Sequence, residues 1–176
     1  MRSKTANWFE CKVRYEKATE ESTQKKVTEQ YVVDALSFSE AEQRITEQMS
    51  AYISGELASP SSVTTQDSSS ELGSPSLLRQ FEITDVKKAQ YKEIFFDDAE
   101  MSDRYYKAKL QFITIDERTE KEKRSAVTYL VQAATLDGAV THINEVMGST
   151  MIDYEKSNIS ETKIMDVFEY KKKSEE

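Results

Sequence analysis

Aromatic rings spaced among lysine and arginine side chains are the residues of this chain best suited to hold a ligand. They alternate along the segments 8–14 and 105–109, which places them on one face of two predicted strands. Rings on a sheet can stack with bases while cations follow the phosphates of a single strand. A solvated antiparallel face is also often rich in Lys and Glu, so the pattern fits a face without function too. The predicted binding face comprises Trp8, Lys12, Arg14, Lys88, Lys92, Tyr105, Lys107, Lys109 and Lys163, interrupted by Glu10 and Glu161.

The overall charge restricts this hypothesis. The 176 residues carry a formal net charge of −8, with a pI of about 4.9, which argues against generic attraction to nucleic acid or anionic membrane. Binding to nucleic acid therefore requires that the basic residues be segregated on one face. No apolar run approaches the roughly 18 residues that a membrane span needs, and the first residues lack the apolar stretch of a signal peptide. We expect a cytoplasmic protein without membrane contact.

Residues for catalysis or metal binding are few. The chain has one cysteine, Cys11, and one histidine, His142, which exclude an intrachain disulfide and a Cys/His zinc site. Cys11 falls in the inward register of its strand and is expected to be a buried structural residue. His142 is expected on the solvated side of a helix. No glycine-rich phosphate loop is present.

An acidic segment lies between the two halves of the chain. Its carboxylates can in principle bind a hard cation, but the segment lacks the glycine and the spacing of an EF-hand loop. A solvated linker is the simpler interpretation, and we predict no metal and no cofactor. The acidic residues are Asp97, Asp98, Glu100 and Asp103.

The elements that would position these residues come from an internal repeat. Tyr129 lies 98 residues after Tyr31, and residues 31–35 (YVVDA) correspond to residues 129–133 (YLVQA). Residues 8–15 correspond to residues 105–112 at a separation of 97, and residues 86–95 to residues 159–168 at a separation of 73. The sequence therefore predicts a tandem duplication.

Each copy is predicted to form a strand–strand–helix–strand unit, which gives an α+β fold with a mainly antiparallel sheet and two helices on one side. Helices are expected to begin at a capping box at Ser39, with Phe38 as a hydrophobic staple, and at Asp137. Third strands are expected over residues 88–96 and 162–170. The strands can form one sheet of about six or two sheets of three. The first strands bury Phe9, Cys11, Val13 and Tyr15 in one copy and Tyr106, Ala108, Leu110 and Phe112 in the other.

These repeats define the predicted organisation. The first repeat covers residues 7–97 and the second covers residues 104–170, followed by a charged tail at 171–176. The first repeat carries an insertion at 58–80, which is rich in Ser and Thr and contains Pro60 and Pro75. Such a composition buries too little apolar surface to order itself, so we expect a flexible loop. A regulatory or partner-binding role is the alternative.

Four segments of the chain resemble an uncharacterised family, a domain of unknown function common in Bacteroidota and seen in their phages. The resemblance covers nearly the whole chain except the insertion, and it implies a bacterial or phage setting but no activity and no catalytic residues. The segments that carry it are residues 7–15 (NWFECKVRY), 33–42 (VDALSFSEAE), 93–98 (EIFFDD) and 159–168 (ISETKIMDVF).

Three functions are compatible with these features. The first is a non-catalytic protein that binds single-stranded nucleic acid through the open sheet face. The second is a protein-interaction module or homodimeric adaptor that joins partners through a sheet edge or face. The third is a phage-type protein that sequesters a small nucleotide between the two copies. An enzyme is the least favoured class, because no nucleophile and base are paired, although scattered carboxylates can still meet in a fold.

Overall fold

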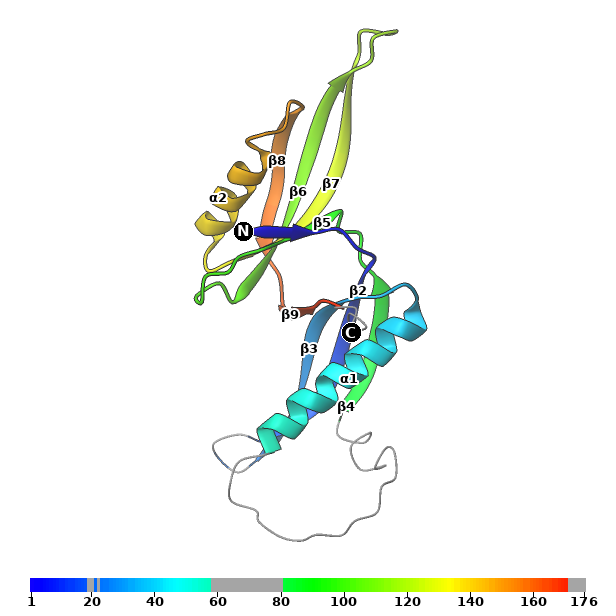
Figure 1. Ribbon diagram of the computed structural model, residues 1–176, viewed down its shortest axis with the longest axis vertical. Helices are drawn as coiled ribbons and strands as arrows, with labels where there is room; N and C mark the ends of the chain where they lie inside the picture. The colour runs from blue at the N-terminus through cyan, green and yellow to red at the C-terminus, as the bar shows by residue number, and fades with distance from the viewer. Residues whose placement is uncertain (19–20, 22, 58–80, 171–176) are drawn as a thin grey trace, which may run out of the picture. The chain divides into compact units, whose positions relative to one another are not determined.

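The computed structural model describes residues 1–18, 21, 23–57 and 81–170, so the predicted insertion at 58–80 and the tail at 171–176 lie outside the described residues. The order strand–strand–helix–strand–strand occurs twice, first from β2 to β5 and then from β6 to β9 (Figure 1). The elements are β1 (Arg2–Lys4), β2 (Trp8–Ala18), β3 (Gln24–Asp34), α1 (Phe38–Leu57), β4 (Phe81–Lys88), β5 (Glu93–Phe96), β6 (Arg104–Ile115), β7 (Glu122–Ala133), α2 (Leu136–Met147), β8 (Asp153–Glu161) and β9 (Ile164–Phe168).

The chain forms two compact units. The five-stranded unit comprises Met1–Trp8 and Ala89–Asp166, and its sheet has the order β1-β5-β7-β6-β8. The four-stranded unit comprises Phe9–Lys88 and Val167–Glu176, and its sheet has the order β4-β2-β3-β9. The α+β prediction is confirmed. The predicted strand numbers, six in one sheet or three in each of two, are wrong.

The last strand of each copy explains the difference in strand number. The predicted third strand at 88–96 contains β5, which begins at Glu93, but only the last residue of β4, which ends at Lys88 and was not predicted. The predicted third strand at 162–170 contains β9 alone, whereas β8 lies before it and was not predicted. β5 pairs in parallel with β7, and β9 lies beside β3, so each copy contributes its last strand to the sheet of the other copy.

A β-bulge occurs at the same place in both sheets. Between β2 and β4 the register skips Thr84, and between β6 and β8 it skips Ser157, which lies 73 residues later. Both bulges carry a small hydroxyl residue on an edge strand, where a bulge interrupts the regular edge that another strand needs for pairing. The repeated bulge agrees with the correspondence between the two copies in the sequence.

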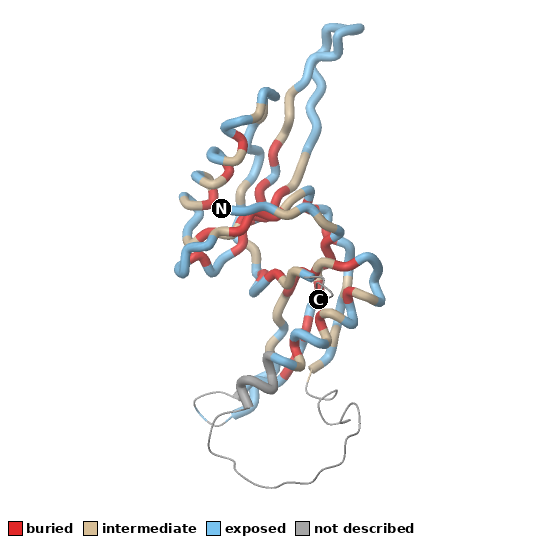
Figure 2. Tube along the Cα trace, viewed as in Figure 1, coloured by how far each residue is buried: buried red, intermediate tan, exposed pale blue. Residues whose placement is uncertain are grey.

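One helix packs on one face of each sheet, as the alternating pattern predicts. In the four-stranded unit α1 buries Ala41, Ile45 and Met49 against the inward side chains of β2 and β3. Phe38 is the first residue of α1 and lies edge-on to Phe9 of β2, with ring centroids 5.1 Å apart. The contact is with the sheet, so the prediction of Phe38 as a staple, which joins the residue before the N-cap to its own helix, is wrong. In the five-stranded unit α2 contributes Ala139, Ile143 and Met147 to the core. Figure 2 shows buried residues in red on the helices and strands of both units.

Both helix N-caps lie two residues before the predicted ones. In α1 the amide of Glu40 donates to Ser37 Oγ (3.2 Å), and in α2 the amide of Gly138 donates to Thr135 Oγ1 (3.0 Å). A side-chain oxygen at the N-cap satisfies an amide of the first turn that has no partner inside the helix. The assignment of Ser39 and Asp137 as N-caps is therefore wrong, because both residues lie within the first turn.

Candidate functional site

The two rings that the sequence places on an open face are buried. Trp8 is 0% exposed and Tyr105 is 3% exposed, so the prediction that both rings are available for stacking is wrong. Three consecutive residues are also buried in β3 (31–33), in β5 (94–96) and in β7 (129–131). Because successive side chains of a strand point to opposite faces, these parts of the strands are buried on both faces. Uninterrupted apolar triplets are typical of strands buried on two sides, and this signal was present in the sequence.

The basic residues of the four-stranded unit are matched by acids. On the outer face of its sheet, away from α1, Arg14 Nη2 lies 2.6 Å from Glu82 Oε2. Lys12 is the cross-strand neighbour of Asp85. The Arg14 guanidinium, as hydrogen-bond donor and as charge, lowers the pKa of Glu82. This part of the predicted face is therefore charge-compensated and offers little net attraction to a polyanion.

The outer face of the five-stranded unit is different. Lys109 is exposed and pairs in register with Thr128 on β7 and Asn158 on β8. Lys107, also exposed, pairs with Leu130 and Ser160. No carboxylate stands directly opposite either lysine, so the positive charge predicted on this face is present here without a matched acid.

Three other predicted lysines do not lie on an outer face. Lys88 pairs in register with Phe9, and antiparallel partners project to the same side, so its position belongs to the helix-covered face. Lys92 lies in the connection before β5, with its ammonium 5.9 Å from the centroid of the Phe112 ring. Lys163 lies in the connection between β8 and β9. All three are exposed.

An aromatic and basic surface does occur, but on the helix-facing side of the five-stranded sheet. Phe112 of β6 and Tyr154 of β8 are half-buried, with ring centroids 6.4 Å apart and planes inclined by 54°. Half-buried Val127 of β7 packs against the same core cluster. Lys156 places its ammonium 5.6 Å from the Tyr154 ring and donates to Asn144 Oδ1 (2.7 Å), while Lys92 lies over Phe112. We call Phe112, Val127, Tyr154, Lys92 and Lys156 the aromatic shelf.

The shelf exists because α2 is short. The two helices begin at corresponding positions, but α1 has 20 residues and α2 has 12, ending at Met147 before Gly148. The hairpin of β6 and β7 continues beyond α2 (Figure 1). In consequence the helix-facing side of β6 and β8 keeps partly exposed rings past the end of the helix.

The corresponding positions of the four-stranded unit are used differently. Tyr15, which corresponds to Phe112, is buried and donates to Glu29 Oε1 (2.9 Å). Tyr31 donates to the other oxygen of the same carboxylate (2.6 Å). Glu29 in turn corresponds to Val127. The polar groups there bind each other, so a partly exposed ring pair flanked by lysines is a feature of the five-stranded unit.

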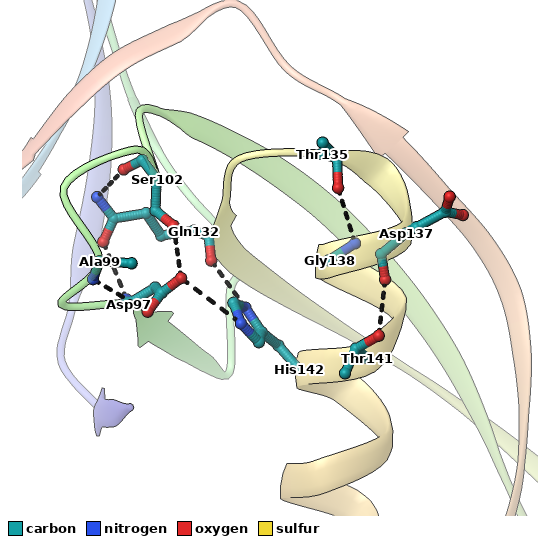
Figure 3. A network of polar contacts seen from close by, with 9 residues as sticks. All are labelled: Asp97, Ala99, Ser102, Gln132, Thr135, Asp137, Gly138, Thr141 and His142. Carbon is teal, nitrogen blue, oxygen red and sulfur yellow. Dashed lines mark hydrogen bonds and ion pairs between the residues drawn. The ribbon is translucent and has the colours of Figure 1, made fainter.

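A polar network joins the segment after β5 to α2 (Figure 3). Asp97 Oδ2 accepts from Ser102 Oγ (2.5 Å) and lies 3.5 Å from His142 Nε2, while Nδ1 of His142 lies 3.1 Å from the carbonyl oxygen of Gln132. Gln132 also donates from Nε2 to Ser102 O (2.8 Å) and accepts from Asp97 N (3.1 Å). The prediction of a solvated His142 is wrong, because its side chain is 18% exposed and lies between two partners.

This network holds the chain rather than activating a nucleophile. In nucleophilic catalysis the histidine stands between the hydroxyl and the carboxylate. Here Ser102 and His142 both approach Asp97 Oδ2, so the hydroxyl faces the carboxylate directly and no histidine stands between them. Arg44 makes the matching contact in the other unit, donating to the carbonyl of Asp34, which corresponds to Gln132. The shared contact indicates that this helix position fixes the preceding strand end.

Protonation of Asp97 should weaken the five-stranded unit. The Ser102 hydroxyl first, then the Ala99 amide and the His142 ring, lower the pKa of the Asp97 carboxyl, although partial burial opposes them. A lowered pKa in the folded state gives stability that is present above the unfolded value of about 3.9 and is lost as pH falls through the folded value. The difference in free energy of unfolding between wild type and Asp97→Asn should be about 1–3 kcal/mol at pH 7 and shrink below pH ~4.

Urea titrations at several pH values, followed by NMR amide signals of the five-stranded unit, would measure this difference. Asp98→Asn is the matched control, because Asp98 is the next residue and is exposed. A difference that stays constant down to pH ~3 would show that the Asp97 charge is not the stabilising group.

A family model described as a domain of unknown function (DUF4494) matches residues 7–71 and 62–170. The chain belongs to the DUF4494 family. No curated protein and no solved structure matches it.

Membership in DUF4494, a domain of unknown function, assigns no catalytic residue. Both halves of the shelf, on β6 and on β8, lie inside the second match. Within the described residues, no group of three or more His, Cys, Asp and Glu side chains is placed to hold a metal ion. In that same part of the chain no helix is long and apolar enough to cross a membrane.

Proposed function

We propose that this protein is a non-catalytic binder of single-stranded nucleic acid that uses the aromatic shelf of the five-stranded unit. The observation that carries the proposal is the pair of partly exposed rings, Phe112 and Tyr154, each with a lysine ammonium within 6 Å of its centroid. Rings provide faces for stacking with any base, and ammonium groups neutralise neighbouring phosphates. The sequence pointed to this chemistry, with Trp8 and Tyr105 as the rings and with Lys92 among the cations.

The geometry of the shelf supports one or two bases rather than a duplex. The rings are 6.4 Å apart and inclined by 54°, so a single flat surface does not span both. Consecutive bases of a flexible single strand can turn to meet each ring, whereas the bases of a duplex are stacked on each other. Lys107 and Lys109, on the opposite face of the sheet, add positive potential that attracts a polyanion without touching a base.

Stacking on the shelf predicts a specific loss of affinity. Phe112→Leu and Tyr154→Leu keep apolar volume but remove the ring, so each should weaken binding of fluorescent single-stranded DNA or RNA by about 5- to 150-fold, equivalent to roughly 1–3 kcal/mol per base. Anisotropy at about 50 mM and 200 mM salt would measure the dissociation constants. Phe81→Leu is the matched control, because half-buried Phe81 corresponds to Tyr154 in the other unit.

The lysines are tested by the salt dependence. Lys92→Ala and Lys156→Ala should each reduce the slope of log affinity against log salt by about 0.7–1, whereas Lys12→Ala, opposite Asp85, should leave it unchanged. Absence of binding at low salt, or equal losses in Phe81→Leu and Tyr154→Leu, would contradict the proposal. A mononucleotide that binds as tightly as an oligomer would instead identify a small-nucleotide binder.

A further inference from the structure

One side of β7 has an edge that the other strands leave open. β5 is short, and it pairs with β7 only along Tyr129–Val131. The amide of Lys92, the residue before β5, donates to Thr128 O (2.9 Å), and the residues between β4 and Lys92 belong to no strand. From Glu122 to Val127, no strand among the described residues pairs with β7 on this side.

The direction of the bond from Lys92 identifies the backbone groups that this edge presents. The carbonyl of Thr128 points toward β5, and backbone groups alternate in direction along a strand. The N–H and C=O groups of Glu122, Arg124 and Ala126 therefore point to the open side, while those of the residues between them bond to β6. The pairing of β6 with β7 is regular over all 12 residues of β6, with no bulge to bend this edge.

The open edge carries local positive charge. Lys123 and Lys92 lie at its two ends, and neither forms an ion pair within the part of the chain that is described. Arg124 lies between them, and its guanidinium already binds Glu122 (2.8 Å) and Glu155 (2.7 Å). Lysines on an edge strand discourage unselective pairing and favour a strand that carries carboxylates.

We propose that the open edge of β7, Glu122–Val127, binds an extended acidic segment of a partner protein as an added strand. Its length, at about 3.3 Å per residue, accommodates a segment of about six residues in line with β5. A second copy docking by the same edge is disfavoured, because a twofold interface brings Lys123 and Arg124 toward their own counterparts. The acidic segment places carboxylates beside Lys123 and Lys92 and bonds its backbone to Arg124 and Ala126.

The test uses a fluorescein-labelled peptide of alternating Val and Glu, eight residues long, with the full-length protein. Wild type should bind it, and hydrogen exchange should slow at the amides of Arg124 and Ala126. Ala126→Pro removes one edge N–H without removing a bond to β6, and proline is tolerated on an edge strand, so this variant should bind at least tenfold more weakly. Ala126→Val keeps the N–H and should bind like wild type.

Several outcomes would overturn the inference. They are no binding by wild type, unchanged amide exchange on binding, equal affinity of Ala126→Pro, and equal affinity for a peptide with Lys in place of Glu. Protection of the same amides at high protein concentration without peptide would assign the edge to a second copy instead. The exchange measurement on wild type keeps the test decisive even if the proline variant folds poorly. Neither peptide binding nor amide exchange depends on whether the protein binds nucleic acid.

Discussion

Leu130→Ala is expected to lower the free energy of unfolding by about 2–5 kcal/mol, although Leu130 points away from α2. Leu130 is 0% exposed, and its register partner across β6 is Lys107 on the same outer face. Removing its side chain leaves a cavity that a well-packed sheet fills only in part, which adds to the lost transfer energy. The result would establish that this end of the sheet is buried on both faces.

Thr128→Ala is the matched control for this prediction. Thr128 lies two residues before Leu130 on the same face and is only half-buried, so its replacement should change the free energy of unfolding by about 0.5–1 kcal/mol. Because two units can unfold separately, urea titrations should follow amide signals that belong to the five-stranded unit. Equally small effects of the two variants would mean that the outer face is open along its whole length, as the alternating pattern had predicted.

The inward face of each first strand was predictable from the sequence, because period-two alternation reports burial on one side. Phe9, Cys11 and Val13 in one copy and Tyr106 and Ala108 in the other are all buried as predicted. The same rule failed for Trp8 and Tyr105, because alternation says nothing of a second buried face. The consecutive apolar residues of the neighbouring strands carried that information.

The exchange of β5 and β9 between the two sheets was not predictable from the repeat. Correspondence between residues 86–95 and 159–168 shows that the two segments play equivalent roles, but it does not show which copy receives each strand. Pairing of a short strand depends on contacts distant in sequence, and local propensity does not report these. β4 and β8 were missed because one third strand was assigned to each copy, at 88–96 and 162–170, where those two strands have already ended.

The aromatic shelf was hidden by a different error. Alternation assigned Phe112 to the core. Its side chain does point toward the core, but it is only partly buried. The length of the helix determines how much of this sheet face it buries, and the sequence contained a signal for that length. The apolar spacing of the first helix continues to Tyr52 and that of the second to Met151, but Gly148 follows Met147, the last residue of the second helix. Glycine is a poor helix former, and the second helix ends at Met147, before the rings are covered.

Cys11 is expected to react with thiol reagents about a thousandfold more slowly in the native protein than in the urea-unfolded chain. Burial first, and then the carboxylates of Asp85, Glu42 and Glu10, raise the pKa of the Cys11 thiol from 9.0 to about 12. The thiolate is the reactive form, so this rise in pKa lowers the thiolate fraction at pH 8 by about a thousandfold. Full burial of Cys11 also limits the access of the reagent to the sulfur. Iodoacetamide labelling at pH 8, followed by mass spectrometry, would give the two rates.

A variant with an exposed thiol calibrates these rates. Ser149→Cys in a Cys11→Ala background places the thiol on an exposed turn, and it should be labelled at similar rates with and without urea. Cys11→Ala is a mild replacement, because buried Ala108 occupies the corresponding position in the other unit. Rapid labelling of native Cys11 would mean that the thiol is accessible as a thiolate, and covalent chemistry at this position would then have to be considered. Slow labelling would leave binding, rather than thiol chemistry, as the activity to test on this fold.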